Sequence, residues 1–375
     1  MIRIKGRVVS NSLLLLFCTS ILLGCGKSDK GIELVEDKKV RFAERYQMVS
    51  LSEAGVIYDD SDTGLVWLAT IDEGEQMEFC YDPNCKHIPA TFNRPDSECM
   101  ASHYIDKTQT MYYEGCVYFF VQNDIFEHSI YKMKTDGAGR ELVARLPFDY
   151  NIAHACIFKE DKVYYHARVG EIDELTNNIS LAKRIVEVNL LDGSYRFITE
   201  ETKDTVLQMD MGENTLYIRR ANASDGWQYI AIADIETQEE KILISNEEYA
   251  HYACMEAYDG DSYFCIDRDN SNICIRNIDG TIEQILVQGA PGEEFGWPDA
   301  SCDGLFYQRT IAYGDEAEGY YFLDLTTGKV TNITEEKDKY GIVGYDGYYD
   351  VFVARDEDFN WTLWSKEKVL GEAKE

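Results

Sequence analysis

The chain has 375 residues, 45% of them hydrophobic and 28% charged, and its 68 acidic and 36 basic residues give a net charge of −32. The hydrophobic fraction excludes an intrinsically unfolded chain. The acidic excess disfavours binding to the phosphate backbones of nucleic acids. The 26 Tyr and 16 Phe are typical of aromatic packing in strands, so the sequence indicates an all-β protein.

Residues 1–24 are predicted to be a secretory signal. Arg3, Lys5 and Arg7 precede apolar residues at 13–17 and 21–23, and this stretch is too short for a stable membrane span. Removal of the three basic residues changes the net charge from −32 to −35. The acidic surface does not suit adsorption on anionic lipid.

The phrase Leu22-Leu23-Gly24-Cys25 resembles the lipobox of bacterial lipoproteins. This resemblance implies cleavage before Cys25, diacylglycerol on its sulfur and anchoring to the cell membrane on the extracytoplasmic side. The alternative is an ordinary signal peptide followed by a coincidental cysteine. We expect residues 25–40 to be the lipidated cysteine and a charged tether, followed by one folded domain over 41–370.

A first structural unit is predicted within residues 48–100, with strands over 56–58 and 65–68. Its end carries the run CYDPNCKH at 80–87, followed by Cys99, so that three thiols and one imidazole lie within twenty residues. Cys80, Cys85, His87 and Cys99 form a Cys3His set, which is a known ligand set for structural zinc. Pro83-Asn84 supplies the turn that the close spacing requires.

A disulfide is the competing interpretation of this run, because the expected compartment is extracytoplasmic. Without Cys18 in the signal and Cys25 under the lipid, 11 − 2 = 9 cysteines remain. Because nine is odd, at least one stays unpaired within the chain. Metal, disulfide and unliganded thiols therefore all stay open, and the first two are both structural, since four ligands leave a zinc no open position.

From residue 113 onward, a turn containing Gly or Asn and then an aromatic strand recurs six times. The aromatic positions are Tyr118, Tyr164, Tyr217, Tyr263, Phe306 and Tyr349. Their spacings of 46, 53, 46, 43 and 43 residues are typical of β-propeller blades. With the unit before residue 100, we predict a single propeller of seven blades, six or eight being the alternatives.

Each blade is expected to contain four short antiparallel strands. In one unit the predicted strands cover 117–122, 129–134 and 140–146, with Asp-Gly in the last turn. No long segment has a sustained 3.6-residue period, so few helices are expected. The unit starting at Tyr345 is short by a strand. Because open sheet edges must be covered, we expect residues 39–51 to supply it.

Other residues that could carry chemistry are interpreted as structural. A hairpin turning at Asp269-Asn270 would set Cys265 opposite Cys274 as a cross-strand thiol pair. The acidic runs 59–64 and 267–270 resemble calcium loops but lack the acidic twelfth residue, so they are predicted to be turns. The remaining thiols are expected to be buried and inert: Cys116, Cys156, Cys254 and Cys302. The remaining histidines are expected to have hydrogen-bond partners within strands or loops: His103, His128, His154, His166 and His251.

The lipobox, the repeat and the run at 80–87 together resemble a group of uncharacterised β-propeller lipoproteins of Gram-positive anaerobic bacteria. That group has a similar Cys-Asp-Pro-Asn-Cys-Lys-His phrase, which Tyr81 interrupts here. The resemblance implies an anaerobic habitat, which weakens the case for disulfides, and it implies no activity.

Two functions remain. The first is a monomeric, membrane-anchored binding or scaffold module for a peptide, glycan or protein. The second is an extracellular enzyme acting on carbohydrate or another polymer. No catalytic motif is present and propellers serve both purposes, so a binding module is predicted, with structural zinc as the only cofactor.

Overall fold

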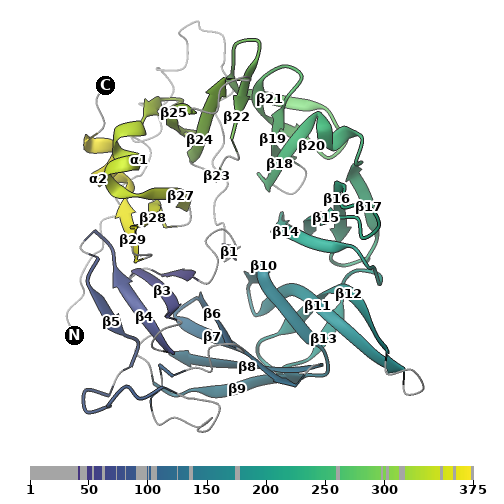
Figure 1. The fold of residues 1–375 in the computed structure, drawn as a ribbon. Coiled ribbons are helices and arrows are strands. Elements are labelled where there is room, and N and C mark those ends of the chain that lie inside the picture. Colours follow the sequence, from purple (N-terminus) through teal and green to yellow (C-terminus); the bar gives the residue numbers. More distant parts are fainter. Residues whose placement is uncertain are drawn as a thin grey trace, which may run out of the picture. The chain divides into compact units, whose positions relative to one another are not determined.

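The protein is a seven-bladed β-propeller (Figure 1). The computed structural model describes residues 41–42, 49–52, 55–60, 64–72, 74–80, 82–89, 99, 101–102, 108–124, 126–134, 138–173, 178–258, 262–296, 299–300, 304–311, 317–346, 349–357 and 360–372. Residues 34–375 form one compact unit, and the described strands make seven antiparallel sheets arranged in a ring.

The first three blades are built from β1 to β13. Blade 1 contains β2 (Val49–Ser52), β3 (Gly55–Asp60), β4 (Leu65–Thr70) and β5 (Gln76–Glu78). Blade 2 contains β6 (Thr108–Tyr113), β7 (Cys116–Asp124), β8 (Glu127–Lys134) and β9 (Glu141–Leu146). Blade 3 contains β10 (Asp149–Lys159), β11 (Lys162–Asp173), β12 (Asn178–Asn189) and β13 (Tyr195–Phe197), and it also pairs with β1 (Arg41–Phe42).

The remaining strands complete the ring. Blade 4 contains β14 (Thr205–Met211), β15 (Thr215–Ala221), β16 (Gln228–Asp234) and β17 (Glu240–Ile244). Blade 5 contains β18 (Tyr252–Ala257), β19 (Ser262–Asp267), β20 (Asn272–Asn277) and β21 (Ile282–Gln288). Blade 6 contains β22 (Glu293–Phe295), β23 (Asp299–Ala300), β24 (Gly304–Ile311), β25 (Ala317–Asp324) and β26 (Val330–Asn332). Blade 7 contains β27 (Ile342–Asp346), β28 (Val351–Arg355) and β29 (Trp361–Ser365).

Helices are few, as predicted. The described residues contain a single 3-10 turn, η3 (Glu248–Ala250), and two short helices, α1 (Thr334–Tyr340) and α2 (Lys366–Glu372). None of the described helices has the length and hydropathy needed to cross a bilayer.

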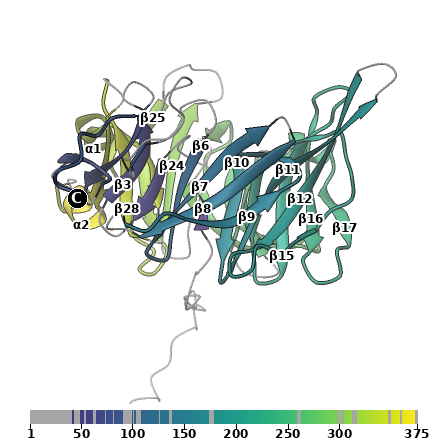
Figure 2. The same cartoon turned by 90° about the horizontal axis from the view of Figure 1, so that it is seen from below.

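The recurring phrase in the sequence marks the turn between the first and second strands of blades 2 to 7. In blade 2, Glu114 and Gly115 form this turn with φ of 44° and 76°, the left-handed values that a tight hairpin requires. We call the end of the ring that carries these turns the turn end. The opposite end, where the chain crosses from the last strand of one blade to the next blade, is the crossover end. Strands β11 and β12 extend past their neighbours at the crossover end (Figure 2).

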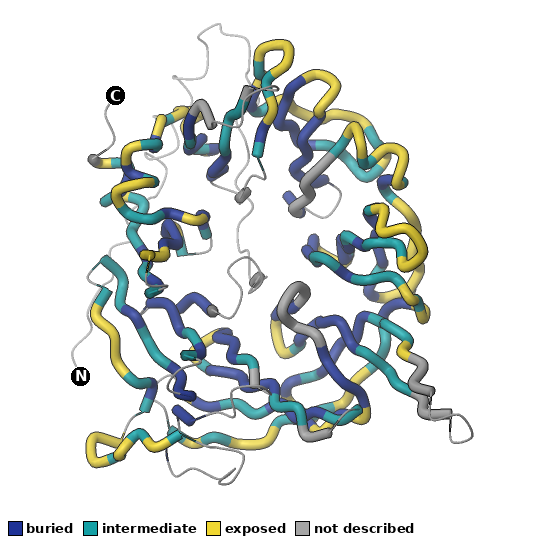
Figure 3. Tube along the Cα trace, in the orientation of Figure 1, coloured by how far each residue is buried: buried dark blue, intermediate teal, exposed yellow. Residues whose placement is uncertain are grey.

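Burial follows the radial position of each strand. The second strands carry the repeated aromatic residues, and Tyr118, Tyr164 and Tyr217 are all buried between blades. The outer strands β17 and β21 are largely exposed, so the apolar core lies in the inner and middle strands (Figure 3).

The last repeat is displaced, because Tyr349 lies in the turn before β28. Val353 takes the strand position.

The predicted closure of the ring by residues 39–51 is wrong. Strand β2 is the first strand of blade 1, and β1 pairs with β10 in blade 3 rather than with blade 7. Blade 7 keeps three strands, and α2 packs against β28 and β29. A parallel bridge joins Ile71 to Leu363. Asp72 accepts hydrogen bonds from Ser365 N at 2.9 Å and from Lys368 Nζ at 2.9 Å.

Candidate functional site

The Cys/His cluster lies just after β5, at the outer part of blade 1. The Phe79 amide donates to Val66 O at 2.9 Å, which holds the start of the loop on β4. The loop returns to the same strand, because the Val66 amide donates to Ala101 O at 2.8 Å. Phe79, Cys99 and Ala101 are buried in one apolar cluster with residues of β3, β4, β7 and β8. Blades 1 and 2 therefore support both ends of the loop.

A tight turn sets the spacing of the ligands, as the sequence predicted. The Asp82 side chain accepts a hydrogen bond from Asn84 N at 2.9 Å, and Asp82 O accepts one from Cys85 N at 3.0 Å. His87 has a φ of 46°, in the left-handed region. The amide of His87 donates to Cys85 Sγ at 3.4 Å. These contacts direct the thiol and the imidazole toward the same point.

The four predicted ligands converge. One donor atom each from Cys80, Cys85, His87 and Cys99 lies within 4.8 Å of all the others, and Cys99 Sγ is 3.7 Å from His87 Nδ1. A tetrahedral zinc site has donor separations of about 3.5–3.8 Å. The donor atoms therefore lie at most about 1 Å farther apart than in such a site, and a contraction of that size would complete the geometry. The cluster could hold a metal ion.

The environment of Cys99 agrees with this chemistry. Burial, with smaller contributions from the neighbouring Cys85 and Cys80, raises the pKa of the Cys99 thiol to about 12. A thiolate at this position therefore needs a compensating cation. A coordinating metal ion provides that charge and deprotonates its thiol ligands.

The second predicted thiol pair is also found. Cys265 lies directly opposite Cys274 in the β19–β20 register, and both side chains are buried. The turn is longer than expected, because the last strand pair is Asp267 with Asn272. A hydrogen bond from Cys265 lowers the pKa of Cys274.

The two acidic runs behave as turns where the structure describes them. Asn270 donates to the Asp267 carboxylate from its amide nitrogen at 3.2 Å and from its side chain at 2.8 Å. Asp59 instead accepts hydrogen bonds from Thr110, at 2.6 Å and 3.2 Å, and so joins blade 1 to blade 2.

The buried histidines divide into two kinds. His128 is satisfied as predicted, with Nδ1 2.6 Å from Phe148 O and Nε2 2.8 Å from the Tyr165 hydroxyl. His166 contradicts the prediction, because neither of its ring nitrogens has a hydrogen-bond partner although the side chain is 1% exposed. Burial lowers the pKa of His128 to about 4 and that of His166 to about 3.

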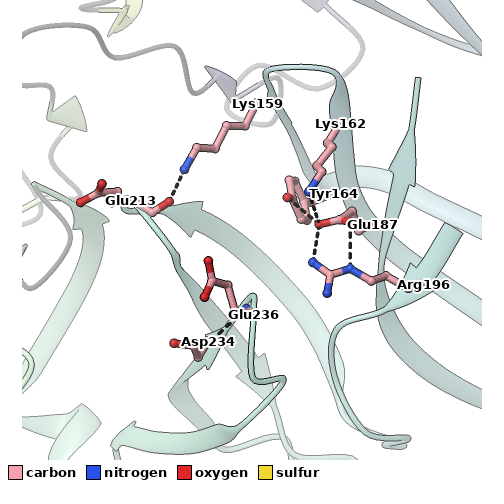
Figure 4. A network of polar contacts seen from close by, with 8 residues as sticks. All are labelled: Lys159, Lys162, Tyr164, Glu187, Arg196, Glu213, Asp234 and Glu236. Carbon is pink, nitrogen blue, oxygen red and sulfur yellow. Dashed lines mark hydrogen bonds and ion pairs between the residues drawn. The ribbon is translucent and has the colours of Figure 1, made fainter. Parts of the chain in front are cut away.

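Sequence reasoning missed an ionic network between blades 3 and 4 near the turn end (Figure 4). The buried Glu187 carboxylate accepts hydrogen bonds from Arg196 at 2.8 and 3.0 Å and from the Tyr164 hydroxyl at 2.7 Å. Lys162 Nζ lies 3.4 Å away. Burial opposes ionisation, but these donors keep the pKa of Glu187 below its usual value. Tyr164 and Arg196 both stand directly opposite Glu187 in the sheet.

Three carboxylates of the first strands are held by neighbouring groups, and one of them, Asp210, joins two blades. Asp149 pairs with Arg168, and Asp210 accepts the amides of Met211 and Ala257, each at 2.6 Å. Glu293 pairs with Arg309 at 2.7 Å. These carboxylates are therefore engaged in inter-strand and inter-blade contacts.

Several predicted residues lie outside the described part of the chain. They are Cys18, the lipidation residue Cys25, His103 and Cys302. Cys254 and His154 lie in described strands, but their side chains are not described.

No protein-family model matches the sequence, and no curated protein matches it. Among solved structures, a puromycin hydrolase is 12% identical with a TM-score of 0.49, covering 84% of this chain and 50% of that chain. The dipeptidyl peptidase 4 of Porphyromonas gingivalis is 9% identical with a TM-score of 0.44, covering 86% and 58%. A computationally designed protein, Ika8, is 12% identical with a TM-score of 0.43, covering 86% and 98%.

Proposed function

We propose that this protein is an extracytoplasmic lipoprotein, anchored through Cys25, whose propeller is a non-catalytic binding module for a peptide, glycan or protein. The observation that carries the proposal is the pairing of β1 with the inner edge of β10. Arg41 lies opposite Phe158 and Phe42 opposite Ile157, close to the turn end of blade 3. Strand β1 therefore lies near the turn end of the ring.

The direction of β1 indicates which end of the ring would face the membrane. Because β1 is antiparallel to β10, Arg41 lies nearer the turn end than Phe42 does. The distance from Cys25 to Arg41 is 41 − 25 = 16 residues, which span at most about 55 Å when extended. In this arrangement the turn end faces the membrane and the crossover end is presented to ligands.

A binding role agrees with the use of the acidic side chains. A hydrolase or lyase of sugars needs carboxylates free to exchange protons with a substrate. Asp149, Asp210 and Glu293 are instead held by arginines or backbone amides. The acidic surface makes nucleic acid an unsuitable ligand.

Membrane fractionation tests the anchor. Cys25→Ser should move the exported protein from the membrane fraction to the extracytoplasmic fluid, because one residue carries both acyl chains. Cys18→Ser, inside the signal, is the matched control and should leave the distribution unchanged. A Cys25→Ser protein that is processed and still sediments with membranes contradicts the lipoprotein assignment.

Ligand arrays test the binding role. The full-length protein in detergent should retain a defined class of glycans or peptides and leave them chemically unchanged. Recovery of shortened or modified ligand after incubation would instead establish the enzyme alternative.

We further propose that Cys80, Cys85, His87 and Cys99 bind zinc in a structural role. Anaerobically purified protein should contain about one zinc per chain, and Cys85→Ser should lower that content. The loop and the edge of blade 1 should then loosen while the other blades stay folded, because the buried residues packed around the cluster belong to blades 1 and 2. Absence of zinc and iron from the wild-type protein, with thiols blocked from alkylation, would favour a disulfide.

A further inference from the structure

Four basic side chains gather between blades 3 and 4 toward the crossover end, and we call them the basic seam: His166, Arg168, Lys183 and Arg220. Tyr164 of β11 packs into the core shared with blade 4, so His166 and Arg168, at alternate positions after it, share that face. Lys183 stands directly opposite Arg168. Arg220 follows Ile218 of the same core by two residues and faces blade 3.

The basic seam contains buried polar nitrogens without hydrogen-bond partners. Both ring nitrogens of His166, Nε of Arg168 and Nε of Arg220 are buried and have no partner. The side chains of His166 and Arg220 are each only 1% exposed. Buried polar groups in folded proteins nearly always have a partner, so the unsatisfied N–H groups of Arg168, Arg220 and the His166 ring call for a bound acceptor.

Within the described part of the chain, two of the three cations of the basic seam have a carboxylate partner at contact distance, and the third, Lys183, does not. Asp149 pairs with Arg168, and Glu240 accepts from Arg220 at 3.0 Å. Lys183 Nζ donates to the Thr205 hydroxyl at 2.8 Å, and no carboxylate among the described residues forms an ion pair with it. Two cations placed directly opposite each other in a sheet repel, so Arg168 and Lys183 favour an anion between them.

A third carboxylate, Asp204, attracts Lys183 without contacting it. Asp204 accepts the Tyr229 hydroxyl at 2.6 Å and the Ala223 amide at 2.9 Å. It acts on Lys183 only over a longer range. His166 is neutral at pH 7, because burial and the nearby cations lower its pKa to about 3, and it can therefore donate one N–H to an anion.

Two side chains of the basic seam are partly accessible, and we call them its rim: Arg168 and Lys183. The Arg168 side chain is 37% exposed, and Lys183 is half-buried. His166 and Arg220 are buried. The rim lies toward the crossover end, away from the end at which β1 enters.

We propose that the basic seam binds an oxyanion group, namely the carboxylate, sulfate or phosphate of a ligand that approaches the crossover end. Lys183 and Arg168 supply the charge, and His166 and Arg220 supply buried N–H donors. The assignment of the basic seam as the recognition site of a binding module rests on the proposed function. Anion binding itself is independent of lipidation and can be measured separately.

Isothermal titration of the full-length protein in detergent tests the proposal, with acetate, galacturonate, sulfate and phosphate at constant ionic strength in chloride. At least one of these anions should bind at one site per chain. Preference for acetate and galacturonate identifies a carboxylate ligand, and preference for sulfate or phosphate identifies a tetrahedral one. Lys183→Gln should weaken binding roughly tenfold or more, since a hydrogen bond from a charged group is lost.

Lys241→Gln is the matched control, because Lys241 is an exposed lysine on β17 and its loss changes the net charge equally. His166→Phe is the second variant and should also weaken binding, with an unfolding transition like that of the wild type. The proposal is overturned if no anion binds beyond the effect of chloride, or if Lys183→Gln and Lys241→Gln bind alike. Failure of membrane anchoring would leave these results unchanged.

Discussion

Two neighbouring boundaries of the ring each bury a histidine, and the two histidines differ in their partners. Between blades 2 and 3, His128 is enclosed by Phe120, Tyr150 and Tyr165 and makes two hydrogen bonds. Between blades 3 and 4, His166 lies among cations and makes none. The same residue type is therefore structural in one boundary and, by our inference, part of a ligand site in the next.

The largest effect is expected from His128→Phe. The substitution keeps an aromatic ring but removes the partners of Phe148 O and the Tyr165 hydroxyl, both within the buried core. We expect a loss of about 2–4 kcal/mol in the free energy of unfolding, from two buried groups left unsatisfied. Urea denaturation measures it.

The double variant His128→Phe/Tyr165→Phe sharpens this result. It removes the orphaned hydroxyl together with its partner, so part of the lost stability should return. If the double variant is less stable than the sum of both single changes, the hydrogen bond is not what stabilises this boundary.

A decrease in pH should destabilise the protein through both histidines. Their pKa values are lowered in the fold, to about 4 for His128 and about 3 for His166, whereas an unfolded histidine titrates near 6.5. Between these pH values the unfolded chain binds more protons than the folded chain. The stability that each neutral, buried histidine contributes is therefore complete above pH 6.5 and is lost as the pH falls.

Between pH 6.5 and pH 5, each histidine should lower the free energy of unfolding by about 2 kcal/mol. Unfolding free energies at pH 7 and pH 5 should therefore differ less in either His→Phe variant than in the wild type. An unchanged difference in both variants would show that other groups govern the acid response.

A smaller effect is expected at the opposite end of the boundary between blades 3 and 4. Glu187→Gln removes the charge that Arg196 and Lys162 share, while the amide can still accept one hydrogen bond. Both cations are more than a third exposed and can turn to water, so we expect about 1–2 kcal/mol of destabilisation. Glu283→Gln, on the exposed strand β21, is the control and should be neutral.

The smallest effect on stability is expected for His166→Phe. No hydrogen bond is lost, so the unfolding free energy at pH 7 should change by less than about 0.5 kcal/mol or rise. A loss as large as that of His128→Phe would mean that His166 has partners of its own, and the contrast between the two boundaries would fail.

Features that depend on interactions between residues close in the sequence could be predicted, and features that depend on distant residues could not. The hairpin turns are local, so the repeat predicted seven blades and placed most aromatic residues correctly. The Cys/His cluster also followed from spacing, because three of its members lie within eight residues. Ring closure could not be predicted, because the contacts of Asp72 with Ser365 and Lys368 depend on the two ends of the ring meeting.

The histidines show the same limit at the level of single residues. In the sequence, His128 and His166 both lie in apolar strands and appear equivalent. Their difference depends on side chains from another strand or blade, Tyr165 for one and Arg220 for the other. Sequence spacing alone does not indicate which acceptors a buried donor will meet.

The most direct test is nuclear magnetic resonance of the protein with nitrogen-15 in its histidine rings, during titration with the anion that binds best. We predict that the imidazole signals of His166, assigned with the His166→Phe variant, shift saturably while those of His128 stay in place. Unchanged His166 signals at saturating anion, or equal shifts at both histidines, would contradict the account.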